Sequence, residues 1–131
     1  MKRTRVALIA AVVATAASAK TGYINLELTC KPASTSLAYL CTVKATDPIG
    51  KPIEHAVITL SADMPAMAMA HNVSPVEAQA IEGRPGEYRG PIMLEMPGEW
   101  AVKVHMKAPQ TKVVVQKLQF EKDSVSPVAR R

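Results

Sequence analysis

A nine-residue stretch, residues 63–71, concentrates the side chains of this sequence that are best suited to bind a soft metal ion. It contains three methionines and one histidine, which are Met64, Met67, Met69 and His71. Thioether sulfur is a soft, uncharged ligand that suits Cu(I), and imidazole also binds copper, whereas magnesium and calcium prefer oxygen ligands. The composition of this stretch therefore predicts a Cu(I) site with these four residues as metal ligands.

The local structure expected for this stretch would bring its donors together. Residues 66–72 are predicted to form a strand, and alternate side chains of a strand share one face. Met67, Met69 and His71 would then line one face at steps of about 7 Å. Long thioether side chains can close such gaps around a single ion.

The methionines also have a simpler interpretation as packing residues. Methionine is an ordinary core residue, so a Met/Ala alternation can fill the interior of a β-sandwich. In that case Ala66, Ala68 and Ala70 would face solvent. A strand that exposes its smallest residues and buries a histidine uses both poorly, and this favours the metal site over core packing.

Two further residues are secondary candidates for the same site. In the strands predicted at residues 87–96 and 99–106, alternate positions are apolar and are assigned to the core. Met93 and His105 occupy the other parity and are expected to point outward. They would complete the metal site if they share an outward face that meets the strand of Met67.

The amino terminus has the parts of a secretory signal peptide. Lys2, Arg3 and Arg5 precede an apolar run at residues 6–17, and small residues follow where signal peptidase cuts. The run of twelve residues is shorter than the roughly 20 that a membrane span needs. Cleavage after Ala19 therefore predicts a periplasmic protein with no membrane span after cleavage.

Length and charge limit the remaining chain to one domain with no tendency to bind nucleic acid. The 112 residues after the predicted cut are enough for one core and too few for two. They carry 13 basic and 11 acidic residues, with no Lys/Arg cluster and few aromatic residues for base stacking. We expect a signal peptide at 1–19, a β-sandwich domain at 20–122 and a disordered tail at 123–131.

The two cysteines of the chain are expected to form a disulfide. Cys30 and Cys41 are spaced too widely for a C-x-x-C metal knuckle, and an exported chain meets oxidising conditions. Residues 24–30 and 37–44 alternate apolar and polar residues, which predicts a hairpin. If the two cysteines face each other, the pairing register puts the apolar residues of both strands on one face.

The pattern of the whole mature chain predicts an all-β fold. Short alternating runs are separated by proline- and glycine-containing turns, and no sustained helical period follows residue 20. About seven strands in roughly 100 residues are typical of an immunoglobulin-like β-sandwich. Further strands are expected at residues 56–62, 66–72, 76–82, 87–96, 99–106 and 112–121.

Four ordered motifs resemble a known bacterial family. They are DPIGKP at residues 47–52, DMPAM at residues 63–67, PGEY at residues 85–88 and MPGEW at residues 96–100. Together they resemble the YtkA-like domain, a relative of the FixH-like proteins, over roughly residues 45–105. The resemblance implies an immunoglobulin-like sandwich associated with copper handling. It carries ligand positions onto Met64, Met67 and His71, which Met69 extends.

The resulting hypothesis is a periplasmic protein that holds Cu(I) for transfer or sequestration. Its expected partner is a metal-efflux complex or an oxidase under assembly. No nucleophile–base pair or carboxylate pair is recognisable, so a carrier is expected in preference to an enzyme. The sequence leaves open whether His55, interpreted as a surface residue, or His105 joins the site. The alternative is a metal-free interaction module whose methionines form an adaptable contact surface.

Overall fold

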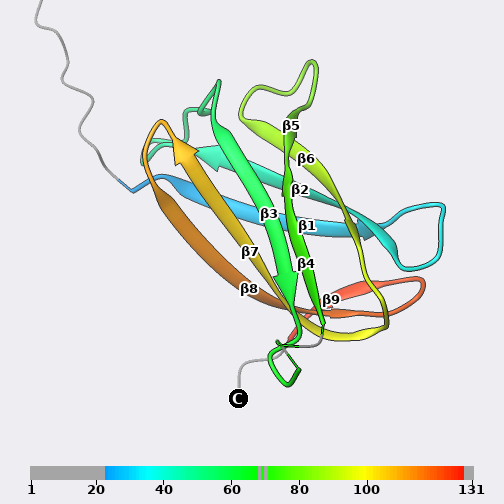
Figure 1. The fold of residues 1–131 in the computed structure, drawn as a ribbon. Helices are drawn as coiled ribbons and strands as arrows, with labels where there is room; N and C mark the ends of the chain where they lie inside the picture. Colours follow the sequence, from blue (N-terminus) through cyan, green and yellow to red (C-terminus); the bar gives the residue numbers. More distant parts are fainter. Residues whose placement is uncertain (1–22, 68, 70, 129–131) are drawn as a thin grey trace, which may run out of the picture.

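The structure is a computed structural model that describes residues 23–128 apart from residues 68 and 70. Within these residues the regular structure consists of nine β-strands (Figure 1). No helix in the described ranges is long and apolar enough to cross a membrane. The predicted signal peptide at 1–19 and the last three residues of the predicted tail lie outside the described residues.

The strands form two antiparallel sheets. The first sheet has the order β1-β2-β6-β5 and comprises β1 (Asn25–Pro32), β2 (Ala38–Thr46), β6 (Glu87–Met93) and β5 (Gln79–Ala80). The second sheet has the order β4-β3-β7-β8-β9 and comprises β4 (Asn72–Glu77), β3 (Val57–Asp63), β7 (Gly98–Ala108), β8 (Lys112–Phe120) and β9 (Val125–Pro127).

The core lies between the two sheets and is built from alternate residues of their strands. The burial of β6 and β7 alternates strictly over most of their length, as the period-two pattern of the sequence predicts. The predicted all-β sandwich is confirmed, with nine strands in place of about seven. The largest fully buried side chains include Trp100, Tyr39, Phe120, Ile58, Leu60, Ile92 and Met106.

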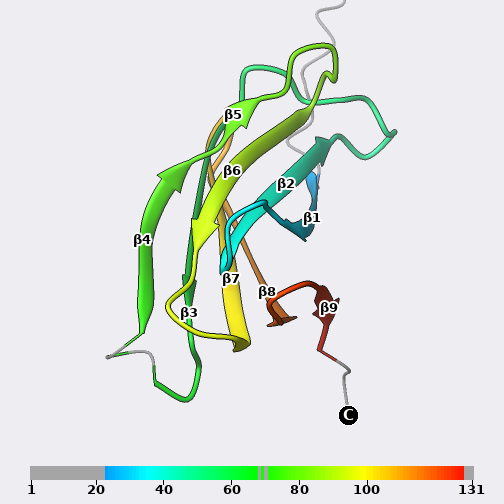
Figure 2. The same cartoon turned by 90° about the vertical axis from the view of Figure 1, so that its right-hand side faces the viewer.

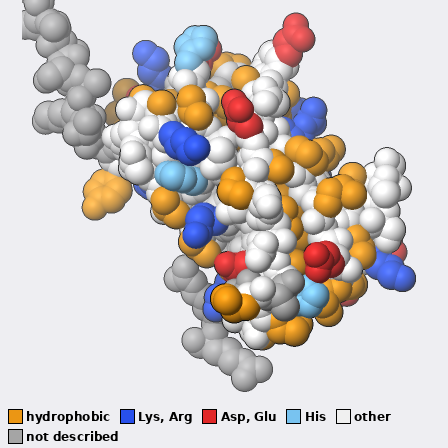
Figure 3. Space-filling view, viewed as in Figure 1, with side chains coloured by type: hydrophobic (Ala, Val, Ile, Leu, Met, Phe, Trp, Pro, Cys, Tyr) orange, Lys and Arg blue, Asp and Glu red, His pale blue; other side chains and the backbone are white. Residues whose placement is uncertain are grey.

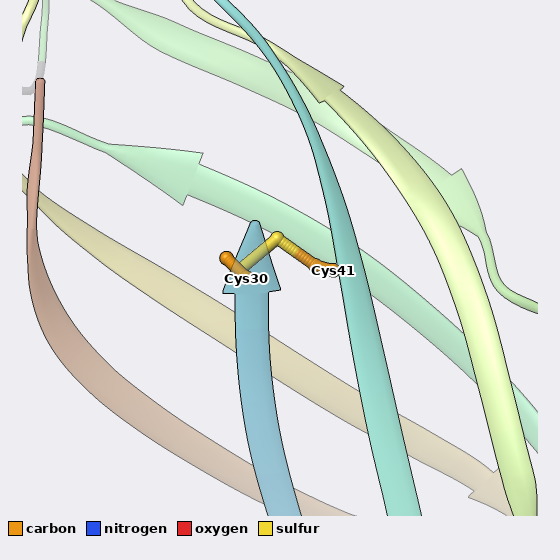
Figure 4. The surroundings of a disulfide bond; sticks show 2 residues. All are labelled: Cys30 and Cys41. Carbon is orange, nitrogen blue, oxygen red and sulfur yellow. A yellow bond between two sulfur atoms is a disulfide. The ribbon is translucent and has the colours of Figure 1, made fainter. Parts of the chain in front are cut away.

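The amino-terminal hairpin has the predicted register. Cys30 lies opposite Cys41, and a disulfide joins them across β1 and β2 (Figure 4). Both cysteines are buried, so the bond is part of the core. The same register pairs Leu28 with Val43 and Leu26 with Ala45.

The carboxy-terminal segment forms a strand where the sequence predicts disorder. The disordered tail was predicted to begin at residue 123, but β9 pairs with β8 and Val125 lies opposite Phe120. Val125 also packs against the hydrophobic core. The predicted disorder rested on the absence of an apolar pattern, and a three-residue edge strand is too short to show such a pattern.

Candidate metal centre

The methionine-rich stretch forms the loop between β3 and β4, and we call residues 64–71 the Met loop. The Met67 N–H donates to the Met64 carbonyl at 2.9 Å, and the His71 N–H donates to the Met67 carbonyl at 2.9 Å. The Met64 N–H donates to the His71 carbonyl at 3.2 Å and joins the two ends of the loop. Both ends are therefore fixed where the hairpin leaves the second sheet.

A strand was predicted at residues 66–72, but among the described residues the strand after β3 begins only at Asn72, and local chemistry explains why. Proline has a fixed φ that suits the second position of a β-turn, and Pro65 occupies that position in the turn from Met64 to Met67. Alanine is depleted in strands, so the residues between the methionines do not favour extended pairing. The donors consequently do not line one strand face.

Burial separates one methionine of the Met loop from the other donors. Met64 is only 8% exposed and belongs to the hydrophobic core. Met67 is 41% exposed and Met69 is 99% exposed, while the side chain of His71 is 28% exposed. Two thioethers and one imidazole are therefore open to solvent in this loop, whereas the fourth predicted ligand faces inward.

Met64 is held against the start of β7. A β-carbon placed on Gly98 would lie 3.0 Å from the terminal methyl carbon of Met64, so the methionine packs over a position without a side chain. Gly98 has a φ of +140°, which side-chain-bearing residues rarely adopt. This contact anchors the amino-terminal end of the Met loop in the sandwich.

One contact of the Met loop was not predicted from the sequence, and it joins His71 to Glu95. Oε2 of Glu95 lies 2.6 Å from Nδ1 of His71. Glu95 belongs to the loop between β6 and β7, which lies at the same end of the molecule as the Met loop (Figures 1 and 2). The two residues are 24 positions apart, and the sequence contains no signal that pairs them.

The secondary candidates Met93 and His105 do not share a face. Met93 is 59% exposed at the end of β6 in the first sheet. His105 lies on the outward face of β7 in the second sheet, and the view in Figure 3 is onto this side of the molecule. The expectation that one outward face carries both is wrong, because adjacent segments of the chain cross from one sheet to the other between them.

His105 and His55 also lie away from the Met loop. His105 pairs with Thr59, four positions before Asp63, which places it roughly 13 Å along the sheet from the end of β3. His55 is an exposed residue that precedes β3, whereas the Met loop follows that strand. Neither histidine is brought to the donors of the loop, and the interpretation of His55 as a surface residue agrees with its exposure.

Across the described residues, no three side chains of His, Cys, Asp or Glu gather closely enough to hold a metal ion. The soft donors of the Met loop are two accessible thioethers and one imidazole with a carboxylate behind it.

Comparison with protein families gives a match to the YtkA-like model over residues 17–105, which is more than half of the chain. The chain belongs to the YtkA-like family. The matched region contains the Met loop, Glu95 and most of β7, while β8 and β9 lie beyond it. A search of curated proteins found no match.

Proposed function

We propose that this YtkA-like protein binds one Cu(I) ion at the Met loop and holds it for transfer or sequestration. The observation that carries the proposal is the accessibility of three soft donors in one anchored loop, which are Met67, Met69 and His71. Methionine is normally a core residue, and two solvent-exposed thioethers in the same loop as a histidine suit Cu(I) better than they suit packing.

Met64 has a different role in this proposal. The sequence predicts it as a fourth ligand, but its burial and its contact with Gly98 favour packing. With the Met64 side chain buried, the end of β3 stays folded while the exposed donors of the loop move onto one ion. We therefore propose Met67, Met69 and His71 as the ligands and Met64 as the anchor of the loop.

The proposed activity is that of a carrier, with copper as cargo. A site at the tip of a hairpin is open to a second protein, whose ligands can replace the donors one at a time. A metal-efflux complex or an oxidase under assembly is the partner that the family resemblance implies. The signal-peptide pattern at residues 1–19 supports export to the periplasm, where the cysteines can be oxidised.

A metal-free interaction module is the second candidate function, and the near-complete exposure of Met69 favours it specifically. Flexible, polarisable methionine side chains form adaptable contact surfaces. In this alternative the tip of the Met loop inserts into a partner without metal.

Competition for Cu(I) distinguishes the two functions. The mature chain, residues 20–131, is titrated against a chromophoric Cu(I) chelator with ascorbate present to keep the copper reduced. We expect one equivalent of Cu(I) to be withdrawn from the chelator. A double Met67→Leu/Met69→Leu variant should lose this competition, because it deletes both sulfurs at nearly constant volume.

The matched control is Met93→Leu, which changes an exposed methionine outside the Met loop and should compete like the unmodified protein. If the unmodified chain withdraws no copper, the carrier proposal is wrong and the interaction module stands. If the double variant competes as well as Met93→Leu, the copper site lies elsewhere.

A further inference from the structure

Glu95 contacts the one histidine of the proposed site through a single ring nitrogen. Its Oε2 lies 2.6 Å from Nδ1 of His71, a distance typical of a charge-assisted hydrogen bond. An imidazole that donates from one ring nitrogen to a fixed acceptor presents the other nitrogen for metal binding. The contact therefore determines which atom of His71 is available to an ion.

The backbone around both His71 and Glu95 is held in place by other hydrogen bonds. The His71 N–H and carbonyl are both bonded within the Met loop. On either side of Glu95, the Leu94 N–H donates to the Leu37 carbonyl at 2.9 Å, and the Trp100 indole donates to the Met96 carbonyl at 3.1 Å. The carboxylate is thus presented to the imidazole from a loop fixed on both sides.

We propose that Glu95 is a positioning residue for copper binding. It holds the proton on Nδ1 of His71 and thereby leaves Nε2 as the nitrogen that binds Cu(I). Carboxylates play this role behind many metal-binding histidines, where they fix the ring and raise its basicity. The inference rests on the proposed function, because it assigns a task to Glu95 in that same site.

Charge gives a second reason for a carboxylate at this position. Two thioethers and a neutral imidazole carry no charge, so a bound Cu(I) ion would leave the site with a net positive charge. The side chain of Glu95 is 62% exposed, and its Oε2 lies 2.6 Å from Nδ1 of His71. Its negative charge balances the ion without occupying a coordination position, and the soft donors remain the only ligands.

The simplest alternative is that the pair only ties two loops together. Exposed ion pairs contribute little to stability. If the pair of His71 and Glu95 had only this small structural role, its removal would leave the Cu(I) affinity unchanged. The positioning role predicts the opposite pattern, with a change in Cu(I) affinity and little change in unfolding. The two interpretations therefore separate in one set of variants.

The first experiment measures Cu(I) affinity by chelator competition in the mature chain. We expect Glu95→Ala to lower the affinity about 10- to 100-fold, as is typical when the partner of a metal-binding histidine is removed. Glu95→Gln keeps an oxygen that can accept from Nδ1, so its loss should be smaller. Glu99→Gln, which neutralises an exposed carboxylate on β7, is the control and should bind as the unmodified protein does.

The second experiment removes the histidine first. In a His71→Ala background, Glu95→Ala should cause no further loss of Cu(I) affinity, because the carboxylate acts through the imidazole. Long-range proton–nitrogen NMR of His71 supplies a readout that a structural tie would not move. It should show the proton on Nδ1 without metal and a shift of Nε2 when Cu(I) is added.

The outcomes separate the two claims. If the unmodified chain competes for Cu(I) and Glu95→Ala competes equally well, the positioning role is wrong while the carrier function stands. Copper bound through Nδ1 would also overturn it. If the unmodified chain withdraws no copper, the carrier function fails and the role of Glu95 in copper binding fails with it. Thermal unfolding of each variant shows whether a loss of affinity arises from loss of the fold.

Discussion

At the scale of single residues, the Met loop places side chains of the same type in different environments. Met64 is buried against Gly98, and Met67 and Met69 are exposed. In the sequence, Met67 and Met69 alternate with alanines and Met64 stands three positions before Met67, but nothing in this pattern tells which of them is buried. Their difference in burial arises from the turn at Pro65, which follows Met64 directly and turns the chain away from β3.

The first prediction concerns these methionines. Met64→Leu should bind Cu(I) as the unmodified chain does, and it should cost less than about 1.5 kcal/mol of unfolding free energy because the volume is nearly kept. Met67→Leu should weaken Cu(I) binding at similar stability. Chelator competition and urea unfolding measure the two effects. A large loss of affinity in Met64→Leu would restore Met64 to the ligand set.

The second prediction concerns Gly98, where the backbone φ of +140° is costly for any residue with a β-carbon. Gly98→Ala should lower the free energy of unfolding by about 1–3 kcal/mol. The new methyl group would also press on the mobile end of Met64. Urea unfolding measures the loss. Gly83→Ala is the comparison, because Gly83 also has a positive φ but has open space around it.

At the scale of elements, the sequence predicts strands well where two independent constraints agree. The hairpin of β1 and β2 has both an alternating pattern and a pair of cysteines, and its register is correct residue by residue. The Met loop has an alternating pattern alone. Methionine and alanine are both apolar, so their alternation does not indicate alternating buried and exposed positions. The pattern therefore predicted a strand in a segment where Pro65 forms a turn.

The third prediction concerns the Cys30–Cys41 disulfide, which closes a short loop across the hairpin. Replacing both cysteines with alanine should lower the free energy of unfolding by about 2–3 kcal/mol, because the unfolded chain regains the entropy of the open loop. Cu(I) binding should survive, since neither cysteine belongs to the Met loop. Loss of copper binding in a variant that remains folded would show that the cysteines take part in the site.

At the scale of the whole molecule, the contacts between distant segments are what sequence patterns do not contain. Glu95 and His71 meet because two loops leave different sheets at the same end of the sandwich. Tyr39 of the first sheet likewise donates its hydroxyl hydrogen to the Glu121 carbonyl, which follows β8 of the second sheet. The sequence predicted a set of metal ligands along one strand, whereas the contact of His71 with Glu95 depends on how the two sheets pack.

The fourth prediction uses the pKa of Tyr39, which burial raises above its ordinary value, with help from the carboxylates of Glu121 and Asp123. The folded state favours the neutral phenol, so the stabilisation is fully present below a pH of about 10, the ordinary tyrosine pKa. It is lost as the pH rises through the raised pKa, because the unfolded chain releases the proton first.

Urea unfolding between neutral and strongly alkaline pH measures this loss, and Tyr39→Phe should flatten its steepest part. The variant keeps the edge-to-face contact with Phe120, whose ring centroid lies 4.8 Å from that of Tyr39. An unchanged alkaline profile in Tyr39→Phe would place the pH dependence on other groups.

The hydrogen bond from the Met64 N–H to the His71 carbonyl has a consequence for how the chemistry of this scaffold can change. It fixes the two ends of the Met loop at the edge of the second sheet, and the described residues between these ends supply no strand to the sandwich. Exposed connections of this kind tolerate replacement well, because a moderate change in loop length costs little closure entropy. The Met loop can therefore be exchanged without altering the sandwich that carries it. Replacing its thioethers with carboxylates or imidazoles would redirect the scaffold toward harder ions while the nine strands keep their places.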